Sequence, residues 1–192
     1  MYKRQDVTGL QSTIFDPSIV NLFFSDNAAN ATIKGVEGDF TYYTNVEGLS
    51  VAGAFSILNT NIDDALVPTN DVVVGTDLAF APGHQGNIRV RKETGMSGGN
   101  VGHVQVQYTF SDSSFSDIMG PNKAEQDSYS YIDLRAGISN DELTAELYVD
   151  NVTDERAEIS NTFVFDRQRI TYIRPTTIGI RAVSYTHLTL PT

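Results

Sequence analysis

Residues 143–150 decide the fold class, and they read Leu-Thr-Ala-Glu-Leu-Tyr-Val-Asp. Apolar side chains alternate here with polar or hydroxyl-bearing ones: Leu143, Ala145, Leu147 and Val149 against Thr144, Glu146, Tyr148 and Asp150. Successive side chains of a β-strand point to opposite faces, so the alternation predicts a strand with one apolar and one polar face. The stretch also contains helix formers such as Glu142 and Leu143, but its period of two is too regular for a helix.

The same period recurs in three further stretches, at residues 49–58, 103–110 and 131–138. We therefore expect an all-β protein, an antiparallel up-and-down meander of about eight strands. The expected strands are residues 6–15, 28–44, 49–58, 84–93, 100–110, 127–139, 142–165 and 169 to about 182. Residues 151–156 should kink the seventh strand. Pro175 should interrupt the eighth, because proline has no N–H to donate to a sheet ladder.

The connections between these strands alternate in length. Residues 45–48, 94–99 and 140–141 form short turns, whereas residues 59–82 and 111–126 form long polar loops. A meander with short turns at one rim and long loops at the other is typical of outer-membrane barrels. A soluble sandwich more often has Greek-key connections.

The composition excludes several classes of protein. The 192 residues include 13 Lys and Arg against 24 Asp and Glu, a formal charge of −11. Such a chain lacks the basic surface of a nucleic-acid binder or of a polybasic membrane-surface protein. Cysteine is absent, which excludes disulfides, thiolate zinc sites and cysteine nucleophiles. No apolar run reaches the roughly 18 residues of a spanning helix, whereas a closed β-barrel crosses a bilayer with a weaker sequence signal.

Both ends of the chain resemble translated sequencing-adapter DNA rather than native protein. The string GTG-TAT-AAG-AGA-CAG, with GTG as start codon, encodes residues 1–5. The reverse complement of the same transposon end, read into its adapter, encodes residues 183–192, Val-Ser-Tyr-Thr-His-Leu-Thr-Leu-Pro-Thr. We therefore expect a metagenomic fragment in which residues 1–5 and 183–192 are adapter-derived and residues 6–182 are native.

Four stretches together resemble the C-terminal barrel of TonB-dependent outer-membrane receptors. They are residues 31–40 with a Gly-Val-Glu core, residues 79–88 with Ala-Pro-Gly-His, residues 146–156 with Tyr-Val-Asp-Asn-Val-Thr-Asp, and residues 174–181 of the final strand. The resemblance implies that residues 6–182 are the last eight strands of a 22-stranded transmembrane barrel. The aromatic residue that usually ends the family is not reached before the adapter sequence.

The resemblance also implies a function. The chain would be part of the wall of an outer-membrane active transporter for a scarce ligand of the siderophore, vitamin B12 or oligosaccharide class. Its partners would be outer-membrane lipid, the missing plug domain and barrel strands, an extracellular small-molecule ligand, and the TonB complex, which acts through the missing N-terminal part. Two alternatives remain: a passive porin or adhesin barrel, and a soluble β-sandwich binding module that packs the apolar faces of two sheets together.

No catalytic constellation and no cofactor motif stand out, so we expect no enzyme. Charged residues of the polar faces should point into the lumen, where they line the wall or meet the plug: Glu37, Asp39, Asp133, Arg135 and Glu146. Weak candidates for calcium or ligand contact are Asp63, Asp64 and Asp71 in a long loop, and the carboxylates of residues 150–154. His84 and His103 lack ligand spacing, and the glycosylation patterns at Asn30 and Asn151 are chance matches in a bacterial protein.

Two geometric expectations follow from the barrel interpretation. The sheet should be open and curved, with edges at the strand near Asp6 and at the C-terminal strand. Its apolar residues should lie on the convex face and its polar residues on the concave face, because a membrane barrel meets hydrocarbon outside and water inside. The apolar set is Leu134, Ala136, Ile138, Leu143, Ala145, Leu147 and Val149, and the polar set is Asp133, Arg135, Glu146 and Tyr148.

Overall fold

The computed structural model describes residues 1–15, 23–67, 71–164 and 167–184. One antiparallel sheet of eight strands dominates them, in the order β1-β2-β3-β4-β5-β8-β9-β12. Its strands are β1 (Tyr2–Phe15), β2 (Phe23–Tyr43), β3 (Leu49–Ala65), β4 (His84–Gly95), β5 (Val101–Ser111), β8 (Tyr129–Ser139), β9 (Leu143–Asp150) and β12 (Thr177–Ser184). The all-β class and the eight-stranded meander predicted from the sequence are confirmed.

Four short strands and two 3-10 turns complete the described part. They are β6 (Ser114–Phe115), β7 (Glu125–Gln126), β10 (Glu158–Val164), β11 (Arg167–Tyr172), η1 (Ser97–Gly99) and η2 (Gly120–Asn122). The pairs β6–β7 and β10–β11 form separate two-stranded sheets. Within the described ranges no helix is long and apolar enough to span a membrane.

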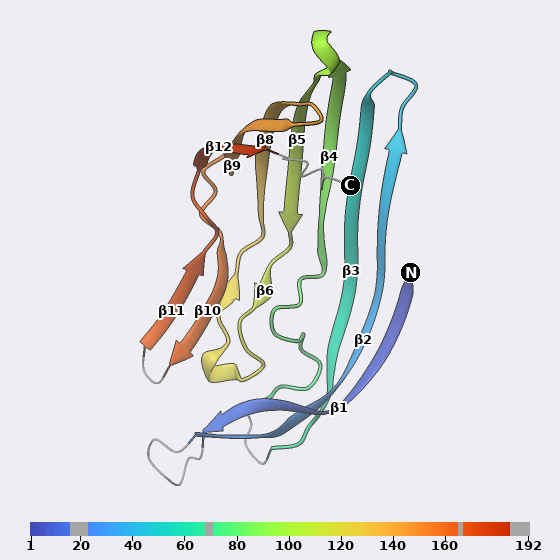
Figure 1. The fold of residues 1–192 in the computed structure, drawn as a ribbon. Helices are drawn as coiled ribbons and strands as arrows, with labels where there is room; N and C mark the ends of the chain where they lie inside the picture. The colour runs from blue at the N-terminus through green and yellow to red at the C-terminus, as the bar shows by residue number, and fades with distance from the viewer. Residues whose placement is uncertain (16–22, 68–70, 165–166, 185–192) are drawn as a thin grey trace, which may run out of the picture.

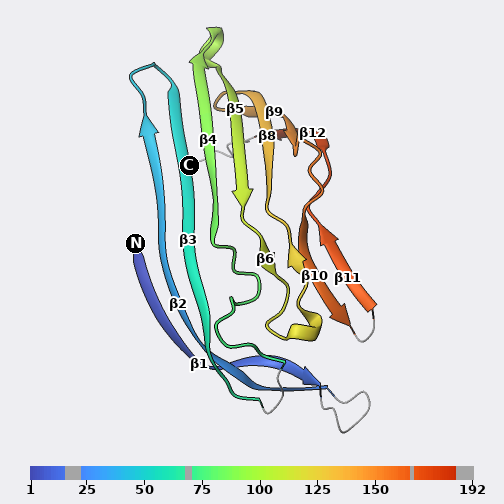
Figure 2. The same cartoon turned by 180° about the vertical axis from the view of Figure 1, so that it is seen from behind.

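The main sheet is open and curved, and it forms part of a cylinder wall (Figure 1, Figure 2). The strands β1 and β12 stand at its two ends, and no ladder joins them in the part of the chain that the structure describes. The predicted pair of edges is therefore confirmed.

Two predicted strands were too long, because each divides into two. The seventh, predicted over residues 142–165, splits into β9 and β10, and the eighth splits into β11 and β12 on either side of Pro175. The first break has a local cause: Asn151 and Asp154 adopt left-handed backbone conformations with φ of 52° and 48°. Such residues leave the extended geometry that a continuous ladder requires. The predicted kink thus becomes the base of a separate hairpin.

The predicted long loops hold more structure than their polar composition indicates. The strand β3 continues to Ala65 instead of ending at residue 58, and residues 111–126 contain β6 and β7. Residues 2–5 extend β1, and residues 183–184 extend β12. Residues 185–192 of the expected adapter segment lie outside the described residues.

The predicted difference between the two rims, short turns at one and long loops at the other, is present. Short turns join β2 to β3, β4 to β5 and β8 to β9 at one end of the sheet, the top in Figure 1. The long connections lie at the other end, which we call the long-loop end. Their described parts are residues 66–67 and 71–83, the β6–β7 hairpin, and the strands β10 and β11.

A small apolar core joins the long connections to the outer half of the β1–β2 hairpin. Its buried members are Ile14, Ala28, Ala29, Ile62, Val72, Ile118 and Met119. The hairpin bends toward these connections (Figure 1) at irregularities in the pairing of both strands, and Gly9 lies at one of them with φ of 66°. The core therefore lies at the long-loop end, where β1, β2 and β3 meet the long connections.

Candidate functional site

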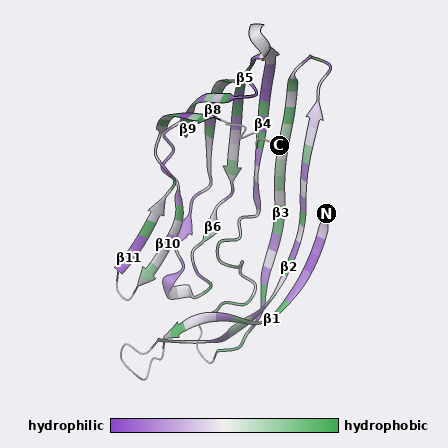
Figure 3. Ribbon diagram, viewed as in Figure 1, coloured by the Kyte–Doolittle hydropathy of each residue, from purple (hydrophilic) through white to green (hydrophobic). Residues whose placement is uncertain are grey.

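The register of the main sheet sorts its side chains into two faces, because directly paired residues of neighbouring strands share a face. The apolar face carries the row Phe40, Gly53, Ile88, Tyr108 and Ile132, and the polar face carries the row Thr41, Ala52, Arg89, Gln107 and Asp133. The alternating colours along the strands of Figure 3 follow this division. We call these two surfaces the apolar face and the polar face.

Along β5, β8 and β9 the polar face is the more buried of the two, which is the reverse of a soluble sheet. In β5, Gln105 is 8% exposed, while its neighbours Val104 and Val106 are 58% and 42% exposed. In a single curved layer, side chains converge on the concave side and spread apart on the convex side. The polar face is therefore concave, as predicted.

The apolar face has the height of a bilayer core. Its members along β3 run from Leu49 to Ile57, and the next two on that face are Asn59 and Asn61. Nine residues at about 3.3 Å each, tilted by about 40°, rise about 23 Å. That rise matches the apolar band of about 25 Å on membrane barrels.

Aromatic rings on this face lie over glycines of adjacent strands. A Cβ atom added to Gly53 would meet the Phe40 ring at 2.8 Å, and one added to Gly38 would meet the Phe55 ring at 2.9 Å. The Phe110 ring lies over Gly86 in the same way, at 3.1 Å. Tyr42 and Phe40 lie toward the short turns and Phe110 toward the long-loop end, so aromatic residues occur near both borders of the band, as in membrane barrels.

Charged side chains of the polar face form a connected network near the short turns. The carboxylate of Glu146 on β9 lies 3.0 Å from His103 Nε2 on β5 and accepts a hydrogen bond from Arg135 on β8 at 3.2 Å. His103 and Glu146 reach across the intervening strand at Gly137, which offers no side chain to separate them. The second amino group of Arg135 donates to Asp150 at 3.1 Å.

The structure groups the predicted luminal residues unequally. Arg135 and Glu146 are joined directly, and Asp133 accepts a hydrogen bond from the Asn151 N–H at 2.8 Å. Glu37 lies on β2 and pairs instead with Lys3 at 2.9 Å. Asp39 also lies on the polar face of β2, several strands away from the network.

Two network members, His103 and Asp150, were not among the predicted luminal residues. The signal that could have found His103 is Gly137, which pairs directly with both His103 and Glu146. A glycine between two polar residues on neighbouring strands marks a place where long side chains can meet above the backbone.

The acidic and histidine candidates are dispersed. Asp63 accepts hydrogen bonds from the Thr32 hydroxyl at 2.6 Å and the Asn61 amide at 2.7 Å, and these bonds lower the pKa of its carboxyl group. Asp64 accepts a hydrogen bond from the Asn30 amide, and His84 lies 2.6 Å from Asp112. Across the described ranges no group of three or more His, Cys, Asp or Glu could hold a metal ion.

Residues 151–156 form a structural turn instead of a cation loop. The Asn151 amide nitrogen donates to the carbonyl oxygens of Glu155 and Arg174 at 2.9 and 3.0 Å, and its amide oxygen accepts from the Glu155 N–H. Asn151 is 3% exposed. Both the nitrogen and the oxygen of its side-chain amide therefore bond to backbone groups. These bonds hold the base of the β10–β11 hairpin next to the end of β9.

The fold is similar to that of several receptors of known structure. The ferric yersiniabactin uptake receptor FyuA from Yersinia pestis matches 83% of the chain at 18% identity, with a TM-score of 0.68. The ferric preacinetobactin receptor BauA from Acinetobacter baumannii matches 96% at 15% identity, also with a TM-score of 0.68. The pyoverdine outer membrane receptor FpvA from Pseudomonas aeruginosa PAO1 matches 94% at 15% identity, with a TM-score of 0.63.

The chain spans about a quarter of these proteins, namely 24%, 26% and 26% of their lengths. A comparison with curated proteins finds no match. The sequence model of one family, described as TonB dependent receptor-like, beta-barrel, matches residues 2–152. That range is well over half of the sequence and includes seven of the eight main strands entire, and the chain therefore belongs to the TonB-dependent receptor-like β-barrel family.

Proposed function

We propose that the chain is part of the barrel wall of an outer-membrane active transporter, which takes up a scarce extracellular ligand with energy delivered through TonB. The outer-membrane location is that of the family's receptors, and lipid would cover the apolar face. The plug domain, the remaining strands and the segment that contacts TonB belong to the complete receptor of which this chain would be one part.

One observation carries this proposal, namely the inverted distribution of polarity over the single curved sheet. An apolar band of bilayer height is open to the surroundings, while the charged network of Arg135 and Glu146 lies on the concave side. A soluble β-sandwich would cover that apolar face with a second sheet. In the described part of the chain the two further sheets are short hairpins at the long-loop end.

Uptake by the complete receptor tests the proposal. The parent gene is expressed in a bacterium that lacks its own receptors, with TonB present or deleted, and accumulation of radiolabelled ligand is measured. Accumulation against a gradient that disappears with TonB supports active transport. Equal influx in both strains, ending at the external concentration, would instead identify a passive porin.

The ligand class is open among siderophores, vitamin B12 and oligosaccharides. Three solved structures of the same fold are described as receptors for ferric yersiniabactin, ferric preacinetobactin and pyoverdine. Ferric siderophores are therefore the first ligands to test, followed by vitamin B12 and oligosaccharides in the same assay.

We also propose that residues 1–5 and 183–192 are adapter-derived and that residues 6–182 are the native part. The support is the codon-by-codon agreement of both ends with sequencing-library DNA. Sequencing the parent gene beyond both ends tests this, since native codons at these positions would contradict it.

A further inference from the structure

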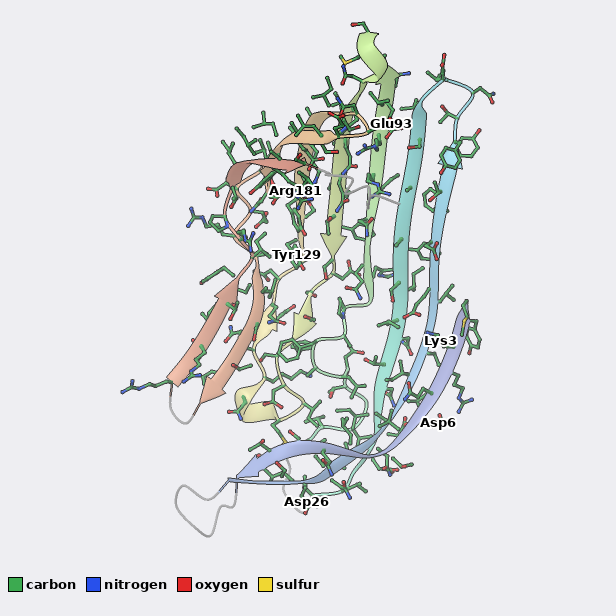
Figure 4. The ribbon with its side chains drawn as sticks, viewed as in Figure 1. Lys3, Asp6, Asp26, Glu93, Tyr129 and Arg181 are labelled. Carbon is green, nitrogen blue, oxygen red and sulfur yellow. The ribbon has the colours of Figure 1, made fainter. Side chains whose placement is uncertain are left out.

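A hollow of about 150 Å³ opens at the long-loop end of the polar face. Its floor is one row of directly paired residues on three neighbouring strands, Gln85, Ser111 and Tyr129. Figure 4 marks Tyr129 at the start of β8. The walls come from residues 80–82 and from the segments around β6, β7 and β10. Four segments of the chain therefore meet around one small volume at the outer mouth of the wall.

The charge of this hollow has one sign. Asp112, Asp127 and Glu158 line it, and no lysine or arginine is among its lining residues. Asp112 is close to His84, and Glu158 accepts a hydrogen bond from the Asn161 amide at 2.9 Å. Asp127 makes no hydrogen bond or ion pair with the residues that the structure describes. An anionic group would be repelled here, whereas a cation would be attracted.

Two aromatic rings, those of Phe80 and Tyr129, share the lining with the carboxylates. Phe80 has a φ of 53°, a left-handed conformation that is unusual for a bulky residue. Its N–H donates to the Phe115 carbonyl at 2.7 Å, and the adjacent Ala79 forms a bridge with Phe115. These contacts fix the backbone at Phe80, whose side chain remains accessible (48% exposed).

We infer that this hollow binds an organic ammonium group. Carboxylates supply the opposite charge, and an aromatic face attracts a cation placed over it, which is the combination that recognises alkylammonium ligands. At about 30 Å³ for each water, the volume equals roughly five waters, so it accommodates one head group. The inference rests on the proposed function for its setting: the group would be a cationic arm of the transported ligand.

Choline and its neutral isostere 3,3-dimethylbutan-1-ol test the inference directly, because they have the same shape and differ in charge. Binding of each to the complete receptor in detergent is measured by saturation-transfer NMR and calorimetry. We expect choline to bind about tenfold more tightly than the isostere. Equal binding of the two compounds, or no binding of choline to folded receptor, would overturn the inference.

Variants assign the binding to the hollow. Asp127→Asn and Phe80→Leu should each weaken choline binding about threefold or more, since one removes a charge and the other a π face. Asp141→Asn is the matched control, because Asp141 is an exposed carboxylate on the short turn between β8 and β9 at the opposite end of the sheet. If this control weakens choline binding as much as Asp127→Asn, the attraction is a property of the overall charge and the hollow is not the site.

Uptake and choline binding, measured on the same receptor, distinguish a failure of this inference from a failure of the proposed transport. A receptor with TonB-dependent uptake but no preference for choline over the isostere retains the proposed function and overturns the ammonium site. A receptor that prefers choline but shows no TonB-dependent uptake keeps the site and loses the proposed function. Folding of each variant is checked by its heat-dependent shift in gel mobility.

Discussion

Glu146 and Leu147 are neighbours on β9, and their side chains lie on opposite faces of the sheet, in different surroundings. Leu147 is 50% exposed on the apolar face, whereas Glu146 is engaged with His103 and Arg135 on the polar face. We predict that Leu147→Arg in the complete receptor costs roughly 2–4 kcal/mol, since the charge would lie in hydrocarbon. The amount of heat-shifting, folded receptor in outer-membrane fractions measures the loss.

The control for this substitution must point inward without disturbing the network. Glu146→Arg is unsuitable, because it would remove an acceptor of Arg135 and place two like charges together. Thr144 lies on the polar face of β9, as Glu146 does, and its uncharged side chain takes no part in the ion pairs of the network. Thr144→Arg should leave the amount of folded receptor close to wild type, and a loss equal to that of Leu147→Arg would contradict the assignment of the two faces.

Gly53 is a position where an added Cβ atom should lower the stability of the barrel. A Cβ atom there would lie 2.8 Å from the Phe40 ring and 2.9 Å from the Asn87 carbonyl oxygen, so the ring and the neighbouring strand would both have to move. We expect Gly53→Ala to destabilise the barrel by about 1–3 kcal/mol. A lower temperature for the gel-mobility shift should report it.

The matched substitution is Gly95→Ala. Gly95 ends β4, and a Cβ atom there would meet nothing within 4 Å. Its transition temperature should stay at the wild-type value. An equal loss at both positions would contradict the role of the aromatic contact, because alanine in place of glycine at an open position restricts the unfolded chain and does not by itself destabilise the fold.

Among the secondary-structure elements, the β10–β11 hairpin depends on the turn at Asn151. Replacement by alanine would remove both donors to the carbonyls of Glu155 and Arg174 and place alanine at a φ of 52°. We predict a local loss of about 1–3 kcal/mol and faster cleavage of this hairpin by protease in the folded receptor. Asn45→Ala, at an exposed asparagine of a short turn, should leave the cleavage rate unchanged.

The elements also show what the sequence could reveal. Alternation along residues 143–150 and 131–138 predicted both the strands and their faces. A strand with hydrocarbon on one face and water on the other must alternate apolar and polar side chains. The division of residues 142–165 was missed, since its cause is the left-handed backbone at Asn151 and Asp154 and not a change in hydrophobic pattern. Asparagine and aspartate favour that conformation, but they are equally common in simple loops.

The buried core at the long-loop end was missed for a different reason. Ile118 and Met119 are two apolar residues within a polar stretch, and neither shows a period. They are buried because the bent β1–β2 hairpin brings Ile14 and Ala28 to them from elsewhere in the chain. The hollow at the mouth depends on the same long-range convergence, so its residues could not be grouped from their spacing.

At the scale of the whole molecule, the two edge strands and the apolar face make the isolated chain a poor soluble protein. The unpaired edges of β1 and β12 can each accept another strand, and the apolar face has no covering layer. We predict that the chain expressed alone aggregates without detergent, as measured by size-exclusion chromatography and light scattering. A monodisperse monomer in detergent-free buffer would favour the soluble module instead.

The exposed apolar face also changes what calorimetry would measure. A soluble domain owes most of its unfolding heat capacity, about 12–15 cal/mol/K per residue, to apolar surface that its own folding hid from water. Here Val104, Leu147 and Ile180 are 58%, 50% and 78% exposed in the folded chain, so folding in water hides little of them. Their contribution to the heat capacity arises only when hydrocarbon replaces water around the wall. The curvature of the stability curve with temperature thus belongs jointly to protein and bilayer, and a change of lipid thickness would alter it with no change in sequence.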